Sequence, residues 1–250
     1  MYTLDELQSR HSVRAYSPNA IPEDIRNKLR AEATLINSRE AGLNFRIVFD
    51  NGEPFNGFTR SYGFFKGVSN YLVPIIDPSF SNAEERAGYF GEQFVMAALR
   101  LGLGSCIVGG TFSSSHVAER LEVYEKIPFL IPFGYPASKL PWTQKMFGHK
   151  KNRPSGRSFF IGTEDEYLEA CRLLPSLPEA LEAVACAPSA LNKRPVRIAL
   201  QKNENGNNLI AYTDSDGKFS AVDLGVAKFN FASVAGGEWE WGQKAPFLPE

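Results

Sequence analysis

The chain has 250 residues, of which 43% are hydrophobic and 22% are charged. This balance is that of a globular protein, and it excludes an intrinsically disordered chain. The length suits one large domain or two small ones. The net charge of −1 argues against a nucleic-acid-binding protein, which normally carries a basic excess.

The sequence contains no run of 18 apolar residues, so we expect neither a membrane-spanning helix nor a membrane partner. The segment Met1–Leu7 is too polar for a signal peptide. Cys106, Cys171 and Cys186 are widely spaced, and the sequence has no CxxC motif or Cys/His cluster. Such cysteines favour free thiols in a reducing compartment. We therefore expect a cytoplasmic protein without a metal site.

The first third of the chain predicts two helices and two strands. Residues 3–9 predict a short helix, and Pro22 suits the first turn of a second one. Four apolar residues then recur at helical spacing, namely Ile25, Leu29, Ala33 and Ile36. Phe45–Phe49 alternates as a strand does, and Tyr71–Ile76 has the continuous apolar pattern of a buried strand.

The middle of the chain is rich in aromatic and glycine residues. Residues 51–67 predict either a loop packed by its own aromatic side chains or a wall over a flat ring. Glu84–Leu101 has a broad apolar surface and predicts a central helix, with Gly102 as its C-terminal cap. Ser105–Val108 predicts a short strand. Gly109-Gly110 then serves either a turn or the close approach of the backbone to a ligand.

The next region combines predicted structure with a basic stretch. Ser113–Tyr124 predicts an amphipathic helix, and Ile127–Phe133 predicts a strand. Residues 136–158 are basic and irregular. They are either a solvated linker or the source of one or two cations for a phosphate group.

The last third predicts a helix, a hairpin and a second helix. Pro178–Ala187 opens with a proline in the first helical turn. Val196–Leu200 and Leu209–Tyr212 flank a polar turn and predict a β-hairpin. Leu224–Ala235 predicts the final helix. The tail from Glu238 onward predicts a strap over the surface.

Three short patterns occur twice in the chain and in the same order. The pairs are Ile21–Ile25 with Leu177–Leu181, Phe45–Val48 with Val196–Ala199, and Gly91–Phe94 with Gly225–Lys228. Each match is weak by itself, and the shared order of helix, strand and helix favours an internal duplication over chance recurrence. Duplicated halves would pack as a pseudo-two-fold pair.

Several segments resemble those of the nitroreductase family of flavoproteins. They are Arg10–Tyr16 with Ile21–Glu23, Gly102–Gly110, Lys150–Pro154 after Gly134–Pro136, and Ala187–Pro195. Tyr62–Gly67 with Asn70-Tyr71 resembles a subgroup in which one chain contains both halves of the usual dimer. The resemblance covers most of the first 155 residues and, more thinly, residues 177–237.

The resemblance implies an α+β fold, a nitroreductase-like three-layer α/β/α sandwich. Two diverged copies would pack as a pseudo-dimer in one chain. The expected halves are residues 1–155 and a shortened second half, 156–250, which together form one compact unit. Such a chain would act as a monomer with one flavin.

In the family, FMN lies at the interface of two subunits. The resemblance therefore implies a set of cofactor-binding residues, namely Arg10, His11, Ser12, Arg14, Lys66, Gly109, Gly110, Lys151, Arg153, Pro188, Ser189 and Asn192. The segment from residue 10 to 14 would hold the phosphate and the pyrimidine side, and the segment from 188 to 192 would approach from the second half. Gly109 or Gly110 would donate a backbone N–H to the flavin N5. Lys151 or Arg153 would reach the phosphate, and Lys66 would lie near the ring.

The implied function is that of an FMN-dependent oxidoreductase. It would take electrons from NADH or NADPH and pass them to a nitroaromatic, a quinone or a similar small-molecule acceptor in a ping-pong mechanism. No catalytic side chain is expected, because the flavin carries the chemistry. Arg194-Pro195-Val196 stands where family members often have Gln-Pro-Trp. Two alternatives stay open: a flavin or nucleotide binder without turnover, and another flavin reaction of the same family.

Overall fold

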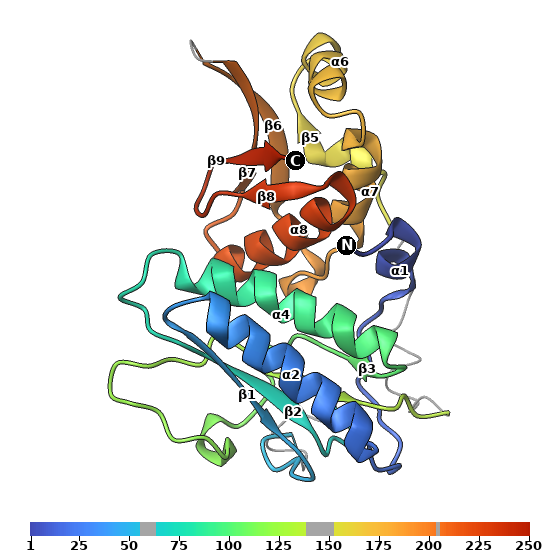
Figure 1. Ribbon diagram of the computed structural model, residues 1–250, viewed down its shortest axis with the longest axis vertical. Helices are drawn as coiled ribbons and strands as arrows, with labels where there is room; N and C mark the ends of the chain where they lie inside the picture. The colour runs from blue at the N-terminus through green and yellow to red at the C-terminus, as the bar shows by residue number, and fades with distance from the viewer. Residues whose placement is uncertain (56–63, 139–152, 204–205) are drawn as a thin grey trace. The chain divides into compact units, whose positions relative to one another are not determined.

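The computed structural model describes residues 1–55, 64–138, 153–203 and 206–250 (Figure 1). The chain divides into two compact units. Unit 1 comprises Met1–Arg10, Glu84–Glu92 and Asn152–Glu250, and unit 2 comprises His11–Ala83 and Gln93–Lys151. The described residues form a mixed α/β fold with two sheets and six α-helices.

Unit 2 contains an antiparallel sheet of four strands in the order β1-β2-β4-β3. The strands are β1 (Leu43–Val48), β2 (Tyr71–Ile76), β3 (Gly104–Ser105) and β4 (Ile131–Gly134). All six residues of β2 are buried, as its apolar run predicts. Helix α2 (Glu23–Arg39) packs beside β1 and buries Leu29, Ala33 and Ile36. The predictions of these two elements from periodicity are therefore confirmed.

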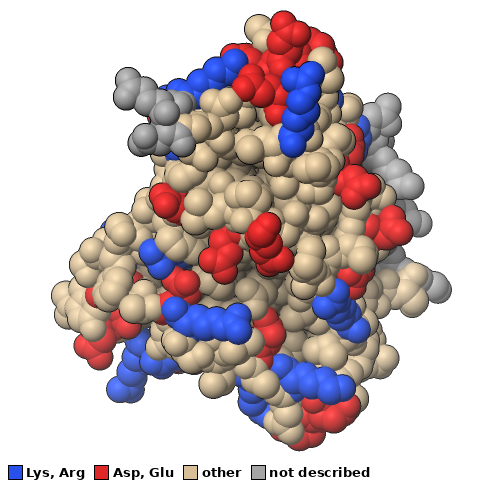
Figure 2. All heavy atoms as spheres, turned by 45° about the horizontal axis from the view of Figure 1, so that its top comes forward, with Lys and Arg blue, Asp and Glu red and all other residues tan. Residues whose placement is uncertain are grey.

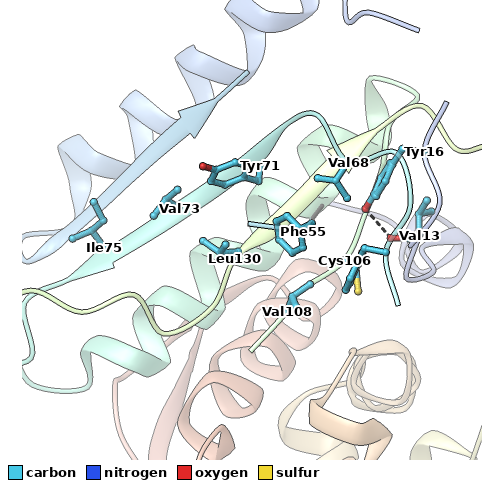
Figure 3. Close-up of a cluster of buried hydrophobic side chains, with 11 residues drawn as sticks. Val13, Tyr16, Phe55, Val68, Tyr71, Val73, Ile75, Cys106, Val108 and Leu130 are labelled. Atoms are coloured by element: carbon cyan, nitrogen blue, oxygen red, sulfur yellow. Dashed lines mark hydrogen bonds between the residues drawn. The ribbon is translucent and has the colours of Figure 1, made fainter. Parts of the chain in front are cut away.

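Buried side chains from distant segments form the core of unit 2 (Figure 3). The Tyr16 hydroxyl lies 2.7 Å from the Val13 carbonyl oxygen and 2.9 Å from that of Pro132. Phe55 packs its ring 5.3 Å from Phe65 and 6.0 Å from Tyr71. These two phenylalanines therefore belong to the core, which favours the self-packed loop over the wall for this part of residues 51–67.

Two predictions for unit 2 are wrong in whole or in part. Ser113–Tyr124 forms only one 3-10 turn, at Ser114–His116, and the remainder is irregular. Leu121, Val123 and Tyr124 are exposed, so the segment buries too little apolar surface to stabilise a helix. The strand expected from Ile127 begins only at Ile131, because Pro128 has no N–H to donate to a ladder.

Unit 1 contains a five-stranded sheet in the order β5-β6-β7-β9-β8. The strands are β5 (Phe160–Ile161), β6 (Val196–Asn203), β7 (Gly206–Thr213), β8 (Gly237–Trp239) and β9 (Ala245–Pro249). The predicted hairpin is confirmed as β6 and β7, paired from Val196↔Thr213 to Asn203↔Gly206. β5 alone among these strands runs parallel to its neighbour.

The tail is not a strap, since it supplies strands β8 and β9 of this sheet. The rings of Phe231, Trp239 and Phe247 lie with their centroids 5.0 Å apart in each pair. Burial of these three aromatic side chains draws the tail into the core of unit 1.

The helices of unit 1 are α1 (Leu4–Ser9), α6 (Glu164–Leu173), α7 (Leu177–Cys186), α8 (Ser220–Ala235) and the first half of α4 (Ala83–Arg100). Thr3 and Thr163 close capping boxes at the starts of α1 and α6. Helix α6 was not predicted. α8 crosses α4 at Gly225, where an added Cβ would lie 1.9 Å from the Glu85 carbonyl oxygen. Glycine is therefore required for this close helix contact.

A buried ion pair ties α4, α8 and the tail together within unit 1. Lys228 and Glu85 pair with side chains that are 0% and 3% exposed. The Lys228 ammonium also donates to the carbonyl oxygens of Glu240 and Gly242, each at 2.9 Å. Glu85 accepts from the Gly242 N–H at 2.9 Å. Burial raises the pKa of Glu85 and lowers that of Lys228, and each partner's charge opposes the other's shift.

On the face that Figure 2 shows, basic and acidic side chains are interspersed. Such mixing gives no extended field of one sign on that face. Among the described residues, no helix is both long and apolar enough to cross a membrane.

Candidate functional site

A group of arginine side chains in unit 1 is the centre of the candidate site. Arg10 directly follows α1, and its side chain is only 11% exposed. Its Nε lies 3.5 Å from Oε1 of Glu92, which is on α4 and fully buried. Among the residues that the structure describes, neither this Nε nor either Glu92 carboxylate oxygen has a hydrogen-bond partner. The pair thus has charge complementarity without hydrogen bonds.

Cys186, the last residue of α7, links Arg10 to a second arginine. Burial raises the pKa of the Cys186 thiol, while the positive charges of Arg153 and Arg10 oppose the shift. The thiol donates to the Glu182 carbonyl oxygen at 3.1 Å. Because both guanidinium groups act on one sulfur atom, Arg10 and Arg153 lie around the same point of unit 1.

Arg194 adds a third cation to this group. Burial lowers the pKa of Arg194, and the positive charge of Arg153 lowers it further. Its Nε is buried without a hydrogen-bond partner in the described part of the chain. We call Arg10, Arg153 and Arg194 the arginine cluster. Like charges gathered in this way favour a bound anion, and guanidinium groups suit a phosphate best.

The loop that carries Arg194 has an unusual backbone. Leu191, Asn192 and Arg194 all have left-handed φ angles, of 53°, 56° and 52°. Three non-glycine residues in this conformation are costly unless their surroundings hold them. The Ser189 hydroxyl accepts from the Arg194 N–H at 2.8 Å and so closes the loop on itself.

Asp223 on α8 binds the backbone of the same loop. Its carboxylate oxygens accept from the Ala190 N–H at 3.0 and 3.2 Å. Burial raises the pKa of Asp223 to about 6, and the Ala190 hydrogen bond opposes the shift. The carboxyl therefore holds the strained segment in position.

An open hollow of about 200 Å³ lies beside this loop. It is lined by residues of α7, the loop and α8, among them Pro188, Ser189, Arg194 and Asp223. Most of this volume is open solvent, and the enclosed part holds about one water molecule. The hollow is therefore not a preformed pocket for a ligand as large as a flavin.

Unit 2 brings Arg14 and Lys66 together. The Val13 N–H donates to the Ser105 carbonyl oxygen at 2.9 Å, and the Lys66 N–H donates to that of Arg14 at 3.0 Å. Val13 and Ala15 are buried, while Arg14 and Lys66 are exposed. The segment that carries Ser12 and Arg14 is thus held beside β3 with its basic side chains outward.

The glycine loop of unit 2 follows a short β-bridge between Val108 and Leu130. A Cβ at Gly110 would meet no atom of the described residues within 4 Å. Neither Gly109 nor Gly110 has a positive φ, in contrast to Gly102 at the end of α4, with φ of 77°. Local packing among the described residues therefore does not require glycine at position 110.

The predicted site residues fall into both units. Arg10, Arg153, Pro188, Ser189 and Asn192 belong to unit 1; His11, Ser12, Arg14, Lys66, Gly109 and Gly110 belong to unit 2. Lys150, Lys151 and the Tyr62-Gly63 part of the subgroup motif lie outside the described residues. Within unit 1, the structure brings Arg10 and Arg153 together. A composite site that joins both sets stays a prediction.

Sequence reasoning missed Glu92, Arg194 and Asp223 as members of the site. Glu92 is an acidic residue within the apolar surface of a predicted central helix, which is a usable signal. Arg194 lies inside a motif that was recognised, at a position where the chain departs from the family. The aspartate offers no comparable signal, because it acts through a loop more than 30 residues away, at Ala190.

Comparison with known proteins places the chain in a family. A family model described as "Putative TM nitroreductase" matches residues 3–235. The chain belongs to this nitroreductase family. Among curated proteins, no match to the chain is found.

Solved structures agree with the family at the level of the fold. A structure described as a "putative nitroreductase" from Thermotoga maritima aligns with a TM-score of 0.62 and 19% identity, over 99% of this chain and 92% of that one. A nitroreductase family protein from Clostridium difficile 630 aligns at 0.47 and 16% identity, over 66% and 99% of the two chains. An FMN-dependent nitroreductase from Clostridium difficile R20291 aligns at 0.43 and 20% identity, over 58% and 95%. The first of these shows that the chain has the nitroreductase-like fold.

Proposed function

We propose that this nitroreductase-family protein is an FMN-dependent oxidoreductase that takes electrons from NADH or NADPH. It passes them to a nitroaromatic, a quinone or a similar small-molecule acceptor. The observation that carries the proposal is the arginine cluster of Arg10, Arg153 and Arg194. In a chain of this family, a partly buried group of three guanidinium groups fits the phosphate of a flavin nucleotide, and two of them have an Nε atom without a hydrogen-bond partner among the described residues.

The residues of the chain fit FMN in their chemistry. Arg10 and Arg153 would bind the phosphate, with Lys151 as the alternative to Arg153, and Arg194 would add a third donor. His11, Ser12 and Arg14 would lie along the phosphate and the pyrimidine side, and Lys66 near the ring. Pro188, Ser189 and Asn192 would approach from the strained loop. Gly109 or Gly110 would offer its N–H to the flavin N5.

Bound FMN supplies the electron transfer itself, so no protein nucleophile or acid is needed. The task of the protein is to bind, orient and adjust charge. The cationic side chains favour the negative charge that the reduced ring acquires, and a backbone N–H at N5 orients the donor. A single site that serves the nicotinamide and the acceptor in turn would give ping-pong kinetics.

We propose further that one chain contains both halves of the usual dimer, residues 1–155 and 156–250. The first half would keep the segment from Arg10 to Arg14, and the second would keep Pro188 to Asn192. One composite site would then remain, and its symmetry mate would be lost. The chain would act as a monomer with one flavin, and equilibrium ultracentrifugation with a flavin-to-protein ratio tests this directly.

Anaerobic reduction is the deciding experiment. The protein is purified, loaded with FMN and mixed with NADH or NADPH without oxygen, while flavin absorbance is followed. Bleaching by either nicotinamide, and recovery on addition of a quinone or a nitroaromatic compound, supports the proposal. A protein that is colourless after incubation with excess FMN and removal of the unbound flavin contradicts it.

A second candidate is a flavin-binding protein without turnover. Two observations favour it: the small hollow beside the loop and Arg194 at a position where family members often have glutamine. Flavin that binds tightly yet is reduced by neither nicotinamide would decide for this candidate. A different flavin reaction of the same family would instead show reduction without transfer to quinones or nitroaromatic compounds.

A further inference from the structure

Glu92 stands in an environment that does not suit a carboxylate. It lies on α4 with a fully buried side chain, and both carboxylate oxygens lack a hydrogen-bond partner among the described residues. A buried charge without hydrogen bonds is strongly destabilised. The charged form of Glu92 therefore depends on Arg10, the cation that lies 3.5 Å from it in the described part of the chain.

The protonation of Glu92 is balanced by these two opposed effects. Burial raises the pKa of Glu92 to about 7, and the charge of Arg10 opposes the shift. A change in the effective charge of Arg10 therefore changes the proton occupancy of Glu92 near neutral pH.

Arg10 also shares the surroundings of Cys186 with Arg153, another member of the arginine cluster. Around Cys186 the charged groups are Arg10 from the N-terminal segment, Arg153 before the 3-10 turn at Gly156–Phe159, and Glu182 on α7. Arg194 faces Arg153 from the strained loop. Burial keeps the Cys186 thiol neutral by raising its pKa, so it gives the cluster no negative charge. The Nε atoms of Arg10 and Arg194 are buried and have no hydrogen-bond partner among the described residues.

We infer that Glu92 is the resident counter-ion of Arg10, and that it takes up a proton from solvent when a phosphate-class anion pairs with Arg10 in its place. The inference rests on the proposed function, since the anion considered is the phosphate of FMN. Two anions beside one guanidinium repel each other, and Glu92 can become neutral by protonation. The carboxyl thereby releases the arginine to the ligand without leaving a second buried charge.

This exchange makes FMN binding dependent on pH in a defined direction. In the complex the pKa of Glu92 lies higher than in the free protein, so above pH 7 the complex holds more protons. Affinity for FMN therefore falls as the pH rises, by up to about tenfold per pH unit. Riboflavin, which has no phosphate, leaves Arg10 with Glu92 and shows no such dependence from this source.

Isothermal titration calorimetry at pH 8 in two buffers of different ionisation enthalpy measures the protons taken up. The FMN phosphate is already a dianion at this pH, since its second pKa is about 6. We expect a net uptake of protons by the wild type, up to about one per FMN, because Glu92 is mostly ionised above its pKa of about 7 in the free protein. Riboflavin should give no uptake.

Glu92→Gln should abolish the uptake and flatten the pH dependence of FMN affinity. Glu84→Gln is the matched control, because Glu84 is exposed on the same helix. This variant should take up as many protons as the wild type. If Glu92→Gln does not fold, the comparison of FMN with riboflavin on the wild type decides.

Three outcomes overturn the inference, and they differ from one another. Equal proton uptake by Glu92→Gln and the wild type assigns the proton to another group. Equal uptake with FMN and riboflavin removes the phosphate from the exchange. Both results leave FMN binding, and with it the proposed function, intact, whereas a protein that binds no FMN refutes both.

Discussion

Removal of Lys228 tests whether the buried ion pair organises unit 1. The change Lys228→Met keeps the length and apolar stem of the side chain but removes its ammonium group. Glu85 is then left 3% exposed without its cation, and the carbonyl oxygens of Glu240 and Gly242 each lose a donor. Breaking a buried pair by removing one partner costs about 3–5 kcal/mol, because an uncompensated charge remains.

Part of this cost is expected to be recovered by a second change. Replacing Glu85 by Gln in the Lys228→Met background removes the unpaired charge while the side chain keeps its hydrogen-bonding oxygen for Gly242. The double variant should therefore be more stable than Lys228→Met alone. Lys202→Met is the matched control, since Lys202 pairs with Glu169 at 3.0 Å with side chains 55% and 35% exposed. Such a pair contributes little, so this variant should unfold like the wild type.

Urea unfolding followed by tryptophan fluorescence is the assay. Two of the three tryptophans of the chain, Trp239 and Trp241, belong to unit 1, and the Lys228 ammonium lies 5.6 Å from the Trp239 ring centroid. Most of the signal therefore comes from the region around the ion pair. A loss of less than about 1 kcal/mol in Lys228→Met, or a double variant no more stable than the single one, would refute the reasoning.

Three further predictions concern the site and its scaffold. Arg10→Ala should weaken FMN binding by about 1.5–3 kcal/mol through loss of a charge-assisted contact, measured by fluorescence titration; the exposed Arg39→Ala should not, and equal affinities would remove Arg10 from the site. Gly225→Ala should lower the unfolding midpoint strongly because its Cβ would lie 1.9 Å from a backbone oxygen of α4. Gly110→Ala, whose Cβ would meet no atom of the described residues within 4 Å, should leave stability unchanged, and equal midpoints would contradict the helix contact. The pKa of Asp223 is raised to about 6 in the folded state, so the folded protein holds this proton more tightly than the unfolded chain does. The contribution of Asp223 to stability therefore falls as the pH rises from about 4 to about 6. Asp223→Asn should remove this slope from unfolding curves measured across that range, and an unchanged slope would assign it to another group.

Local sequence patterns were sufficient to predict those elements whose secondary structure depends least on long-range contacts. The continuous apolar run Tyr71–Ile76 is buried throughout as β2, because no other element fits so short a run between turn residues. The polar turn between Val196–Leu200 and Leu209–Tyr212 likewise forms a hairpin, since its two strands need only each other for register. The family was also recognised from local motifs, above all the segments around Arg10 and Ser189.

Only the tertiary structure decided which charged residues are buried. Glu85 and Lys228 are 143 positions apart, and nothing near either one predicts the other. Ser113–Tyr124 has helical periodicity but leaves Leu121, Val123 and Tyr124 exposed. The tail, in contrast, packs Trp239 and Phe247 against Phe231 and forms two strands. The pairing of Glu92 with Arg10 at 3.5 Å also joins two residues that are far apart in the sequence. Periodicity encodes which face is apolar, but the partner of a buried charge depends on long-range packing, which a local pattern does not contain.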